Sequence, residues 1–390
     1  MSKKFVVSAP GKIILHGEHS VVYNKPAIAG PIGLRTYFEF EESSESFITF
    51  DFKRLDLILK MKFETANLFL SSLELLPPTE FLQKLRISKD FILKLVEVPR
   101  ILSEKEEMAI SATLFIFHRI LLSEKIIKIP GCFTVKIDSD IAIGAGIGSS
   151  ASFGVSLAGG FFIYSQIINE NIENFDNFCF NDEILEKISQ WAFDSEVLMH
   201  EKPSGIDNTI CTYGQLVKFN RGEKPQTIKT QGSPIDILLV DTGVSRSTSN
   251  VVGKVANFRN RHLSLANSIF DSMGFLVDDV VKILEFESVS DDAKFQELSE
   301  LISVNNNLLR AIGVSHPRLE TVFNIAESFN FHAKLTGAGA GGCAFVILPS
   351  NYKNSENYEK MCEELKANKF QILPTVIATG SGVELKVEKN

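Results

Sequence analysis

The first third of the chain alternates short apolar runs with polar, Gly and Pro positions. The runs are "KFVVSA", "TYFEFE", "SFITFDF" and "CFTVKI". Such runs, bounded by turn-forming residues, are typical of β-strands. Ser103 to Leu122 differs, because Ser103 and Glu106 match a capping box and a long apolar stretch follows them. The pattern predicts a β-rich segment with one buried helix packed on its sheet.

Helical spacing dominates the later part of the chain. It predicts helices over 183–200 and near 249–285, 291–312, 317–330 and 354–369. Between and after them lie the strand-like runs "IDILLVDTG", "HAKLTG", "CAFVIL", "ILPTVIA" and "VELKV". A polar stretch with two prolines and two glycines, 221–234, marks a boundary. We therefore expect an α+β fold with two domains, residues 1–225 and 226–390, rather than a doubly wound parallel sheet.

Composition narrows the classes of function. The formal net charge of −8 argues against a nucleic-acid binder that relies on a basic surface. No run reaches the roughly 18 apolar residues of a membrane span, and the N-terminus lacks the order of a signal peptide. The five cysteines are spread out without a C-x-x-C pair, which favours reduced thiols. We expect a cytoplasmic protein that binds neither nucleic acid nor membrane.

The stretch "GAGIGSSAS", residues 144–152, is the sharpest chemical signal. A glycine loop that leads into a helix exposes backbone N–H groups at the positive end of the helix dipole, and its natural ligand is a phosphate chain. The third glycine comes one residue early for a dinucleotide-binding fingerprint, and the lysine of a Walker A loop is missing. A helix start whose small residues permit close packing fits equally well, so both interpretations stay open.

Three further segments carry candidate chemistry. In "EVLMHEKPSGIDN", Glu196 and Asp207 flank a Pro-Ser-Gly turn that can bring a metal ligand and a proton acceptor into one pocket, although the H-E-x-x-H order of a zinc site is absent. The glycine run in "KLTGAGAGGCAFVIL" enters a strand and so lacks a helix dipole. Taken singly, each also fits caps, turns and solvated ion pairs. The third segment, "SAPGKIILHGEHSVVY", holds Lys12, His16, Glu18 and His19. Taken alone, it fits a solvated pair of Lys12 and Glu18 at a strand end, with both histidines as satisfied polar residues in a turn.

The order and spacing of these segments together point to one protein family more specifically than any single segment does. The stretches "APGKIILHGEH", "GAGIGSSAS" and "KLTGAGAGGC" resemble the three motifs of the GHMP small-molecule kinases. Within that family "HGEHSVVYNKPAIA" and "PSGIDN" are similar to the branch that phosphorylates mevalonate, and the branches specific for galactose and for phosphomevalonate fit less well. The resemblance implies a two-domain α+β GHMP kinase fold, with an S5-like N-terminal and a ferredoxin-like C-terminal domain. It also implies transfer of a phosphoryl group from ATP to the C5 hydroxyl of (R)-mevalonate, in isoprenoid biosynthesis.

The resemblance also implies a role for each matching residue. Asp207 accepts or orients the hydroxyl proton, and Lys12 stabilises charge on the transferred group. Ser150 and Glu196 hold Mg²⁺. Glu18, His19 and Thr248 belong to the mevalonate pocket. The nucleotide is bound by Lys12, Ser139, Gly144, Ala145, Gly146, Ile147, Gly148, Ser149 and Ser150.

Further implications concern regulation, assembly and alternatives. The resemblance suggests feedback inhibition by farnesyl or geranyl diphosphate, and a homodimer. Ala340 stands where the third motif usually has glycine, which matters only if that position needs a positive φ. A GHMP kinase for another small alcohol, such as a sugar, and a catalytically silent relative that binds nucleotide or an isoprenoid diphosphate are the other hypotheses. An enzyme is favoured over a silent relative because Lys12, Ser150, Glu196 and Asp207 are all present.

Overall fold

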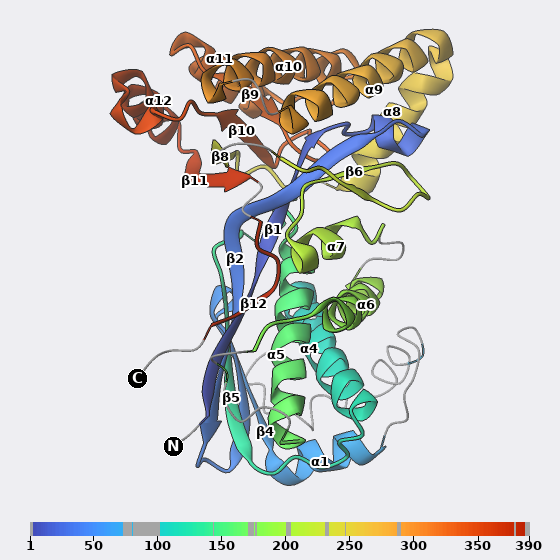
Figure 1. Cartoon of the computed structure of the whole chain (residues 1–390), viewed down its shortest axis with the longest axis vertical. Helices are drawn as coiled ribbons and strands as arrows, with labels where there is room; N and C mark the ends of the chain where they lie inside the picture. The colour runs from blue at the N-terminus through green and yellow to red at the C-terminus, as the bar shows by residue number, and fades with distance from the viewer. Residues whose placement is uncertain are drawn as a thin grey trace.

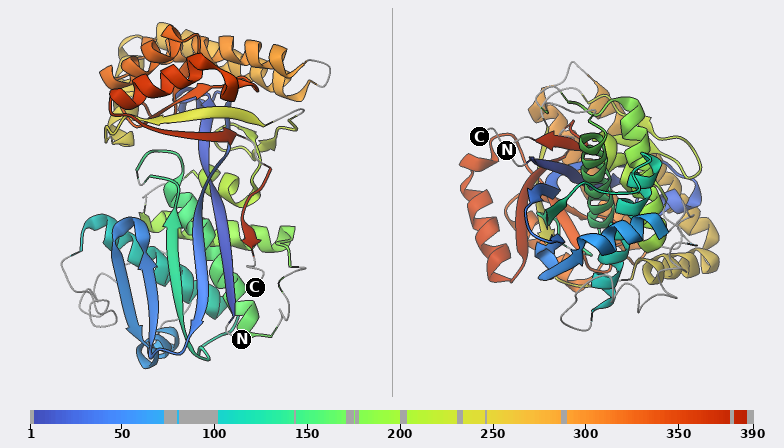
Figure 2. Two further views of the ribbon diagram at one scale, coloured as in Figure 1. Left: turned by 90° about the vertical axis from the view of Figure 1, so that its left-hand side faces the viewer. Right: turned by 90° about the horizontal axis from the view of Figure 1, so that it is seen from below.

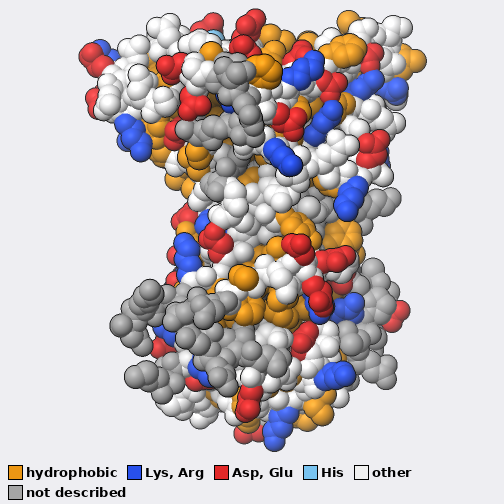
Figure 3. All heavy atoms as spheres, in the orientation of Figure 1, with side chains coloured by type: hydrophobic (Ala, Val, Ile, Leu, Met, Phe, Trp, Pro, Cys, Tyr) orange, Lys and Arg blue, Asp and Glu red, His pale blue; other side chains and the backbone are white. Residues whose placement is uncertain are grey.

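Two lobes joined by a narrower middle form an elongated molecule in the computed structural model of the chain (Figures 1 and 3). The structure describes residues 3–72, 80, 102–142, 144–170, 175, 178–199, 204–230, 234–245, 247–286, 290–377 and 380–386. Helices cover one face of the strands in each lobe, as the side view shows (Figure 2).

The lower lobe of Figure 1 holds most of the chain before residue 214. Its strands line up beside one another, and a phenylalanine-rich core fills the space between them and the helices. Its elements are β1 (Lys4–His16), β2 (Ala27–Ser43), β3 (Phe47–Phe52), η2 (Lys53–Leu55), β4 (Leu57–Lys62), α1 (Phe63–Ser72), α4 (Glu104–Ser123), β5 (Cys132–Ser139), α5 (Ser149–Ile168), α6 (Asp182–Met199) and α7 (Ile206–Tyr213). The short helix η1 (Ser20–Tyr23), between β1 and β2, packs instead on the upper lobe, where Tyr23 stacks on Phe270.

The upper lobe is a smaller group of strands covered by long helices (Figure 1). Strand β10 lies between β8 and β9, and β11 pairs with the other edge of β8. The remaining elements are β6 (Val217–Phe219), β7 (Gln226–Thr227), β8 (Ile235–Asp241), α8 (Thr248–Arg261), α9 (Leu263–Glu285), α10 (Asp291–Ala311), α11 (Pro317–Ser328), β9 (His332–Leu335), β10 (Cys343–Ile347), η4 (Tyr352–Asn354), α12 (Glu356–Ala367), β11 (Gln371–Ile377) and β12 (Glu384–Lys386).

Strands β1 and β2 are long enough to belong to both lobes (Figure 2). Their lower halves lie in the phenylalanine-rich core, whereas Ile13, Leu15, Ile28 and Ile32 pack in the core under the upper helices. Strand β2 pairs with β5 below and meets β11 above at Ile32 and Ile377. The division of the chain near residue 225 stays a prediction, and these two strands cross from one lobe to the other well before it.

Helix α5 is the central helix of the lower lobe. Gly160 lets it approach the sheet closely, because a Cβ at that position would lie 2.2 Å from the ring of Phe38. Among the described residues α5 is the one helix long and apolar enough to cross a membrane, and 83% of that window is buried inside the protein. The expectation that no run is that apolar was therefore wrong, and the apolar stretch is a core helix.

Most expected elements are present, with two corrections. Helix α4 begins at the predicted capping box, in which Ser103 accepts a hydrogen bond from the backbone N–H of Glu106 and the Glu106 carboxylate accepts one from Ser103. The helix expected over 249–285 is broken at His262 into α8 and α9. Strand β4 and helix α1 were not predicted, although the alternation of "LILKMK" was an available signal for the strand.

The C-terminal segment 380–386 returns from the upper lobe to the lower one. Strand β12 pairs with β1, and the backbone N–H of Val383 donates to the Thr212 carbonyl at the end of α7. The buried guanidinium of Arg35 donates to the carbonyls of Ser8 and Gly382 and pairs with Glu384. This segment therefore fixes α7 against β1.

Candidate active site

A cavity of about 640 Å³ opens between the two lobes. Its wall comes from β1, the glycine loop at 144–148, the first turns of α5, α7 and α8, part of α4, and residues 337–338 from the upper lobe. The wall is apolar near Phe52, Met108 and Phe153, and charged near Lys12 and Asp207. We call the part of the wall near Phe52, Met108 and Phe153 the apolar arm. It suits an apolar group, whereas the part near Lys12 and Asp207 suits a charged one.

Lys12 reaches the cavity because β1 is irregular beside it. The pairing of β1 with β2 changes register between Pro10 and Gly11, and a bulge of this kind re-aims the side chains next to it. The Lys12 backbone N–H donates to the Ile147 carbonyl of the glycine loop at 2.9 Å. Strand and loop are therefore joined at the position that carries the lysine.

The glycine loop has the conformation that its sequence requires. Gly144, Gly146 and Gly148 have φ of 84°, 81° and 81°, a region in which residues with a Cβ are strained. A Cβ on Gly148 would lie 2.7 Å from Cγ of Lys12. Ala145 and Ile147 point into the core between these glycines, and Ser149 and Ser150 begin α5 at the cavity wall. The loop and the start of a 20-residue helix thus have the conformation that an anion site requires, and phosphate binding there stays a prediction.

Lys12 and Asp207 form an ion pair at the end of this loop. Nζ of Lys12 lies 3.1 Å from Oδ2 of Asp207, and both residues line the cavity. Asp207 belongs to the first turn of α7, which follows Gly205 at φ of 78°. A carboxylate at a helix N-terminus is stabilised by the helix dipole. The turn "PSGIDN" therefore delivers the carboxylate to the lysine, and the interpretation of Lys12 and Glu18 as a solvated pair is wrong.

Glu196 lies on α6 behind this pair, in a buried position. Burial, and then the negative charge of Asp207, raise the pKa of Glu196 to about 8, while Lys12 acts in the opposite direction. Two carboxylates this close are stabilised by a cation, because a bound cation offsets both the burial and the repulsion. Glu196 is thus near Asp207, as the sequence predicts, although it does not line the cavity itself.

His19 occupies a strained turn at the cavity wall. Its φ of 63° and ψ of −45°, with a hydrogen bond from the Ser20 N–H to the Glu18 carbonyl, define a γ-turn of the rare class. Such strained backbone costs on the order of 1–3 kcal/mol and persists where the surroundings enforce it. The ring Nε2 lies 2.8 Å from the Ala338 carbonyl, which only accepts, so Nε2 carries the proton.

The electrostatics keep the His19 ring neutral. Burial lowers its pKa, and the bond to Ala338 and the charge of Glu18 only partly oppose that. With Nε2 protonated, Nδ1 of the neutral ring is a hydrogen-bond acceptor. His19 lines the cavity, so it can accept a hydrogen bond from a hydroxyl group there.

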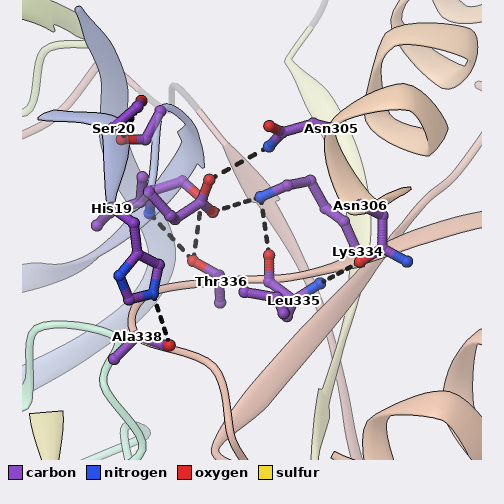
Figure 4. A network of polar contacts seen from close by, with 11 residues as sticks. His19, Ser20, Asn305, Asn306, Lys334, Leu335, Thr336 and Ala338 are labelled. Carbon is purple, nitrogen blue, oxygen red and sulfur yellow. Dashed lines mark hydrogen bonds and ion pairs between the residues drawn. The ribbon is translucent and has the colours of Figure 1, made fainter. Parts of the chain in front are cut away.

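The Glu18 carboxylate faces the upper lobe. It pairs with Lys334 of β9 and accepts a hydrogen bond from the Asn305 amide of α10 at 3.2 Å (Figure 4). Sequence reasoning missed Lys334 and Asn305 as partners of Glu18. A lysine inside the apolar strand-like run "HAKLTG" was the available signal, because a buried ammonium requires a partner.

The other expected site residues lie along the cavity wall. Ser139 follows the apolar arm, where its hydroxyl bonds with Thr36 at 2.9 Å and its carbonyl accepts from the guanidinium of Arg54. Thr248 is the first residue of α8 and faces the cavity from the upper lobe. The exposed charges of Arg54 and Lys105 at this arm were not predicted.

Two interpretations from the sequence need correction. His16, expected to be a satisfied polar residue in a turn, is fully buried at the end of β1, and neither ring nitrogen has a hydrogen-bond partner in the described part of the chain. Burial, and then Lys334, hold its pKa well below the usual range, so the ring is neutral. Ala340 has φ of 55°, so this departure from the usual glycine does place a side chain in the left-handed region.

Comparisons with known proteins agree with this geometry. Models of the GHMP kinase N-terminal domain and of the GHMP kinase C-terminal region match residues 112–215 and 290–367. A mevalonate kinase of Gibberella zeae is 33% identical over 98% of this chain and 77% of its own length, and that of Homo sapiens is 30% identical over 97% and 94%. The crystal structure of L. major mevalonate kinase in complex with R-mevalonate superposes with a TM-score of 0.67 at 22% identity, over 95% of this chain and 94% of that one.

These matches confirm the α+β GHMP kinase fold that the motifs predict. The two mevalonate kinases match over 98% and 97% of this chain. The chain therefore belongs to the mevalonate kinase family of GHMP kinases.

Proposed function

We propose that this chain transfers the γ-phosphoryl group of ATP to the C5 hydroxyl of (R)-mevalonate, giving 5-phosphomevalonate and ADP. The observation that carries the proposal is the Lys12 to Asp207 ion pair, which lies at the end of a glycine loop in a cavity that also presents His19 and Thr248. The relatives that match nearly the whole chain are named mevalonate kinases.

The cavity supplies each group that an in-line transfer needs. The N–H groups of the glycine loop and of the first turn of α5 hold the phosphates. Asp207 accepts a hydrogen bond from the C5 hydroxyl, whose oxygen attacks the γ-phosphorus while the bond to the β-phosphate oxygen breaks. The hydroxyl proton passes to the Asp207 carboxylate as the new P–O bond forms. Lys12 stabilises the charge on the transferred group, and such positioning and electrostatic terms dominate phosphoryl transfer.

Ser150 and Glu196 fit a magnesium ion. Both supply oxygen, and the raised pKa of Glu196 beside Asp207 marks a position where a divalent cation relieves unfavourable charge. Mg²⁺ usually keeps several waters and phosphate oxygens among its ligands, so two protein oxygens are enough for it. When bound, Mg²⁺ would neutralise charge on the β- and γ-phosphates.

Substrate choice is the experiment that tests this function. Purified protein is mixed with MgATP and one acceptor at a time, (R)-mevalonate, galactose or phosphomevalonate, and ADP release is followed by a coupled assay. We expect release to depend on mevalonate. If galactose supports ADP release and mevalonate does not, the acceptor is reassigned. If none of the three acceptors supports ADP release, the proposed function is contradicted.

Inhibition by prenyl diphosphates, a homodimer and a cytoplasmic location stay predictions. Farnesyl or geranyl diphosphate carries a diphosphate that the glycine loop can bind, and an apolar tail that matches the arm near Phe52 and Met108. We expect farnesyl diphosphate to raise the apparent KM for MgATP. An unchanged KM would contradict this, and sedimentation of the chain as a monomer would contradict the dimer.

A further inference from the structure

The Glu18 to Lys334 pair, called the sealed pair below, is almost completely buried, although Glu18 is among the residues that line the cavity. The exposed fractions of the two side chains are 1% and 0%. The ammonium of Lys334 also donates to the Leu335 carbonyl at 2.8 Å and lies 5.2 Å from the ring centroid of Phe345. The other oxygen of Glu18 accepts from Asn305. A substrate in the cavity therefore meets a Glu18 carboxylate that is already paired.

Two segments far apart in the sequence meet along this pair: 14–19, from the end of β1 into the next turn, and 334–338, from the end of β9 into the loop after it. Figure 4 shows His19 beside Lys334, Thr336 and Ala338. Thr336 Oγ1 accepts from the backbone N–H of Ile14 and donates to its carbonyl. Glu18 pairs with Lys334, and His19 donates to the Ala338 carbonyl. The third glycine motif thus begins with a segment that holds the turn carrying His19.

The contacts of Glu18 and His19 with 334–338 can hold the strained turn at His19 in place. Glu18 and His19 are consecutive, and the γ-turn hydrogen bond joins the Glu18 carbonyl to Ser20. The side chains of Glu18 and His19 both bind to segment 334–338, so these contacts restrain the backbone between the two residues from both sides. A strained conformation that is over-determined in this way is typical of a functional position.

We propose that Lys334 is a positioning residue for the phosphoryl acceptor: it acts through Glu18 to hold the His19 turn, so that Nδ1 of the ring faces the alcohol. This inference rests on the proposed function, since it assigns the acceptor to the His19 side of the cavity. A buried ion pair adds little net stability compared with apolar residues of similar size. Its effect is therefore on geometry, and the acceptor site depends on it more than the nucleotide site does.

A double variant tests this without leaving a lone buried charge. Glu18→Gln with Lys334→Met removes both charges and keeps similar volumes. We expect the KM for mevalonate to rise about ten-fold or more, because small displacements of a positioning group have effects of that size. The Kd of MgADP, whose phosphates bind at the glycine loop, stays within about two-fold because that loop does not contact the pair.

The matched control is another lysine and carboxylate pair that joins a residue before position 225 to one after it. Lys218 of β6 lies 2.7 Å from Asp278 of α9, partly exposed to solvent, and neither residue lines the cavity. Lys218→Met with Asp278→Asn should leave both the KM for mevalonate and the Kd of MgADP unchanged. An effect that came only from the loss of a lysine and carboxylate contact between these two parts of the sequence would instead appear in both double variants.

The outcomes separate this inference from the proposed function. A folded Glu18→Gln, Lys334→Met protein with an unchanged KM for mevalonate overturns the positioning role, while wild-type activity still supports the function. A wild type with no alcohol-dependent ADP release overturns the function instead. If the double variant does not fold, Asn305→Leu decides, because it removes one hydrogen bond from Glu18 and keeps both charges. Its KM should rise, and no change would overturn the inference.

Discussion

Two lysine and carboxylate pairs of the same chemistry lie near the cavity in different surroundings. In the open pair the side chains of Lys12 and Asp207 are 9% and 34% exposed, whereas in the sealed pair those of Lys334 and Glu18 are 0% and 1% exposed. The open pair lines the cavity, so a substrate can replace or join its contacts. The carboxylate of the sealed pair already has two protein partners. Glu18 lines the cavity as well, so exposure and the number of protein partners, more than residue type, distinguish a pair suited to chemistry from one suited to holding position.

The largest effect is expected at the open pair. Asp207→Asn keeps the shape of the side chain but removes the charge that holds the hydroxyl, so kcat should fall by on the order of 10³-fold. The melting temperature should change little, because the carboxylate is partly exposed. ADP release and thermal unfolding of the same preparation check both statements. A variant that keeps near-normal kcat would remove Asp207 from its role.

At the sealed pair, removal of one partner should lower the stability of the fold, whereas at the open pair it should mainly lower kcat. Lys334→Met leaves the Glu18 carboxylate buried and unpaired, which lowers the free energy of unfolding by about 3–5 kcal/mol. Urea unfolding measures this loss. Lys12→Met, its counterpart at the open pair, leaves a carboxylate that water can reach, and a loss of stability as large as that of Lys334→Met would erase the distinction between the two pairs.

The open pair also depends on how α7 is held. Gly382 of the C-terminal segment approaches α7 so closely that a Cβ there would lie 1.9 Å from the Thr212 carbonyl oxygen. Gly382→Ala should therefore displace the segment or the helix, lowering stability by about 1–3 kcal/mol and reducing kcat through Asp207. Gly253→Ala is the control, since no atom lies within 4 Å of a Cβ there. Equal effects of the two variants would show that the C-terminal contact has no special role.

The smallest effect is expected where a pair is neither sealed nor in the cavity. Lys187 and Glu183 form an exposed pair one turn apart on α6. Lys187→Met should change the free energy of unfolding by less than about 0.5 kcal/mol. A larger loss in urea unfolding would mean that exposure does not separate strong from weak pairs in this chain.

The sequence predicted the open pair better than the sealed one for a physical reason. Lys12 and Asp207 lie in motifs whose glycines and turn residues restrict the backbone, as φ of Gly148 and Gly205 shows. The capping box at Ser103 could also be predicted from the local sequence, because its two partners are only three residues apart. The Glu18 to Lys334 contact joins residues 316 apart, and no local spacing reports such a contact.

The burial of individual polar residues was equally hard to predict from the amino-acid sequence alone. His16 and Lys334 look like surface residues by type, yet both are completely buried, because β1 and β9 enter the region between the lobes. The γ-turn at His19 also could not be foreseen, since histidine rarely takes a positive φ. Local conformation was therefore predictable where glycine or a cap marks it, and long-range burial was not.

The difference between the two pairs is tested most directly by one measurement, the rate of ADP formation at saturating MgATP and mevalonate. It is made on the Asp207→Asn variant and on the Glu18→Gln, Lys334→Met variant. If the open pair serves the transfer and the sealed pair positions the acceptor site, the Asp207→Asn rate stays low at saturation, while the double variant recovers to within about five-fold of wild type. Equal and unrecovered losses in both proteins would contradict the account.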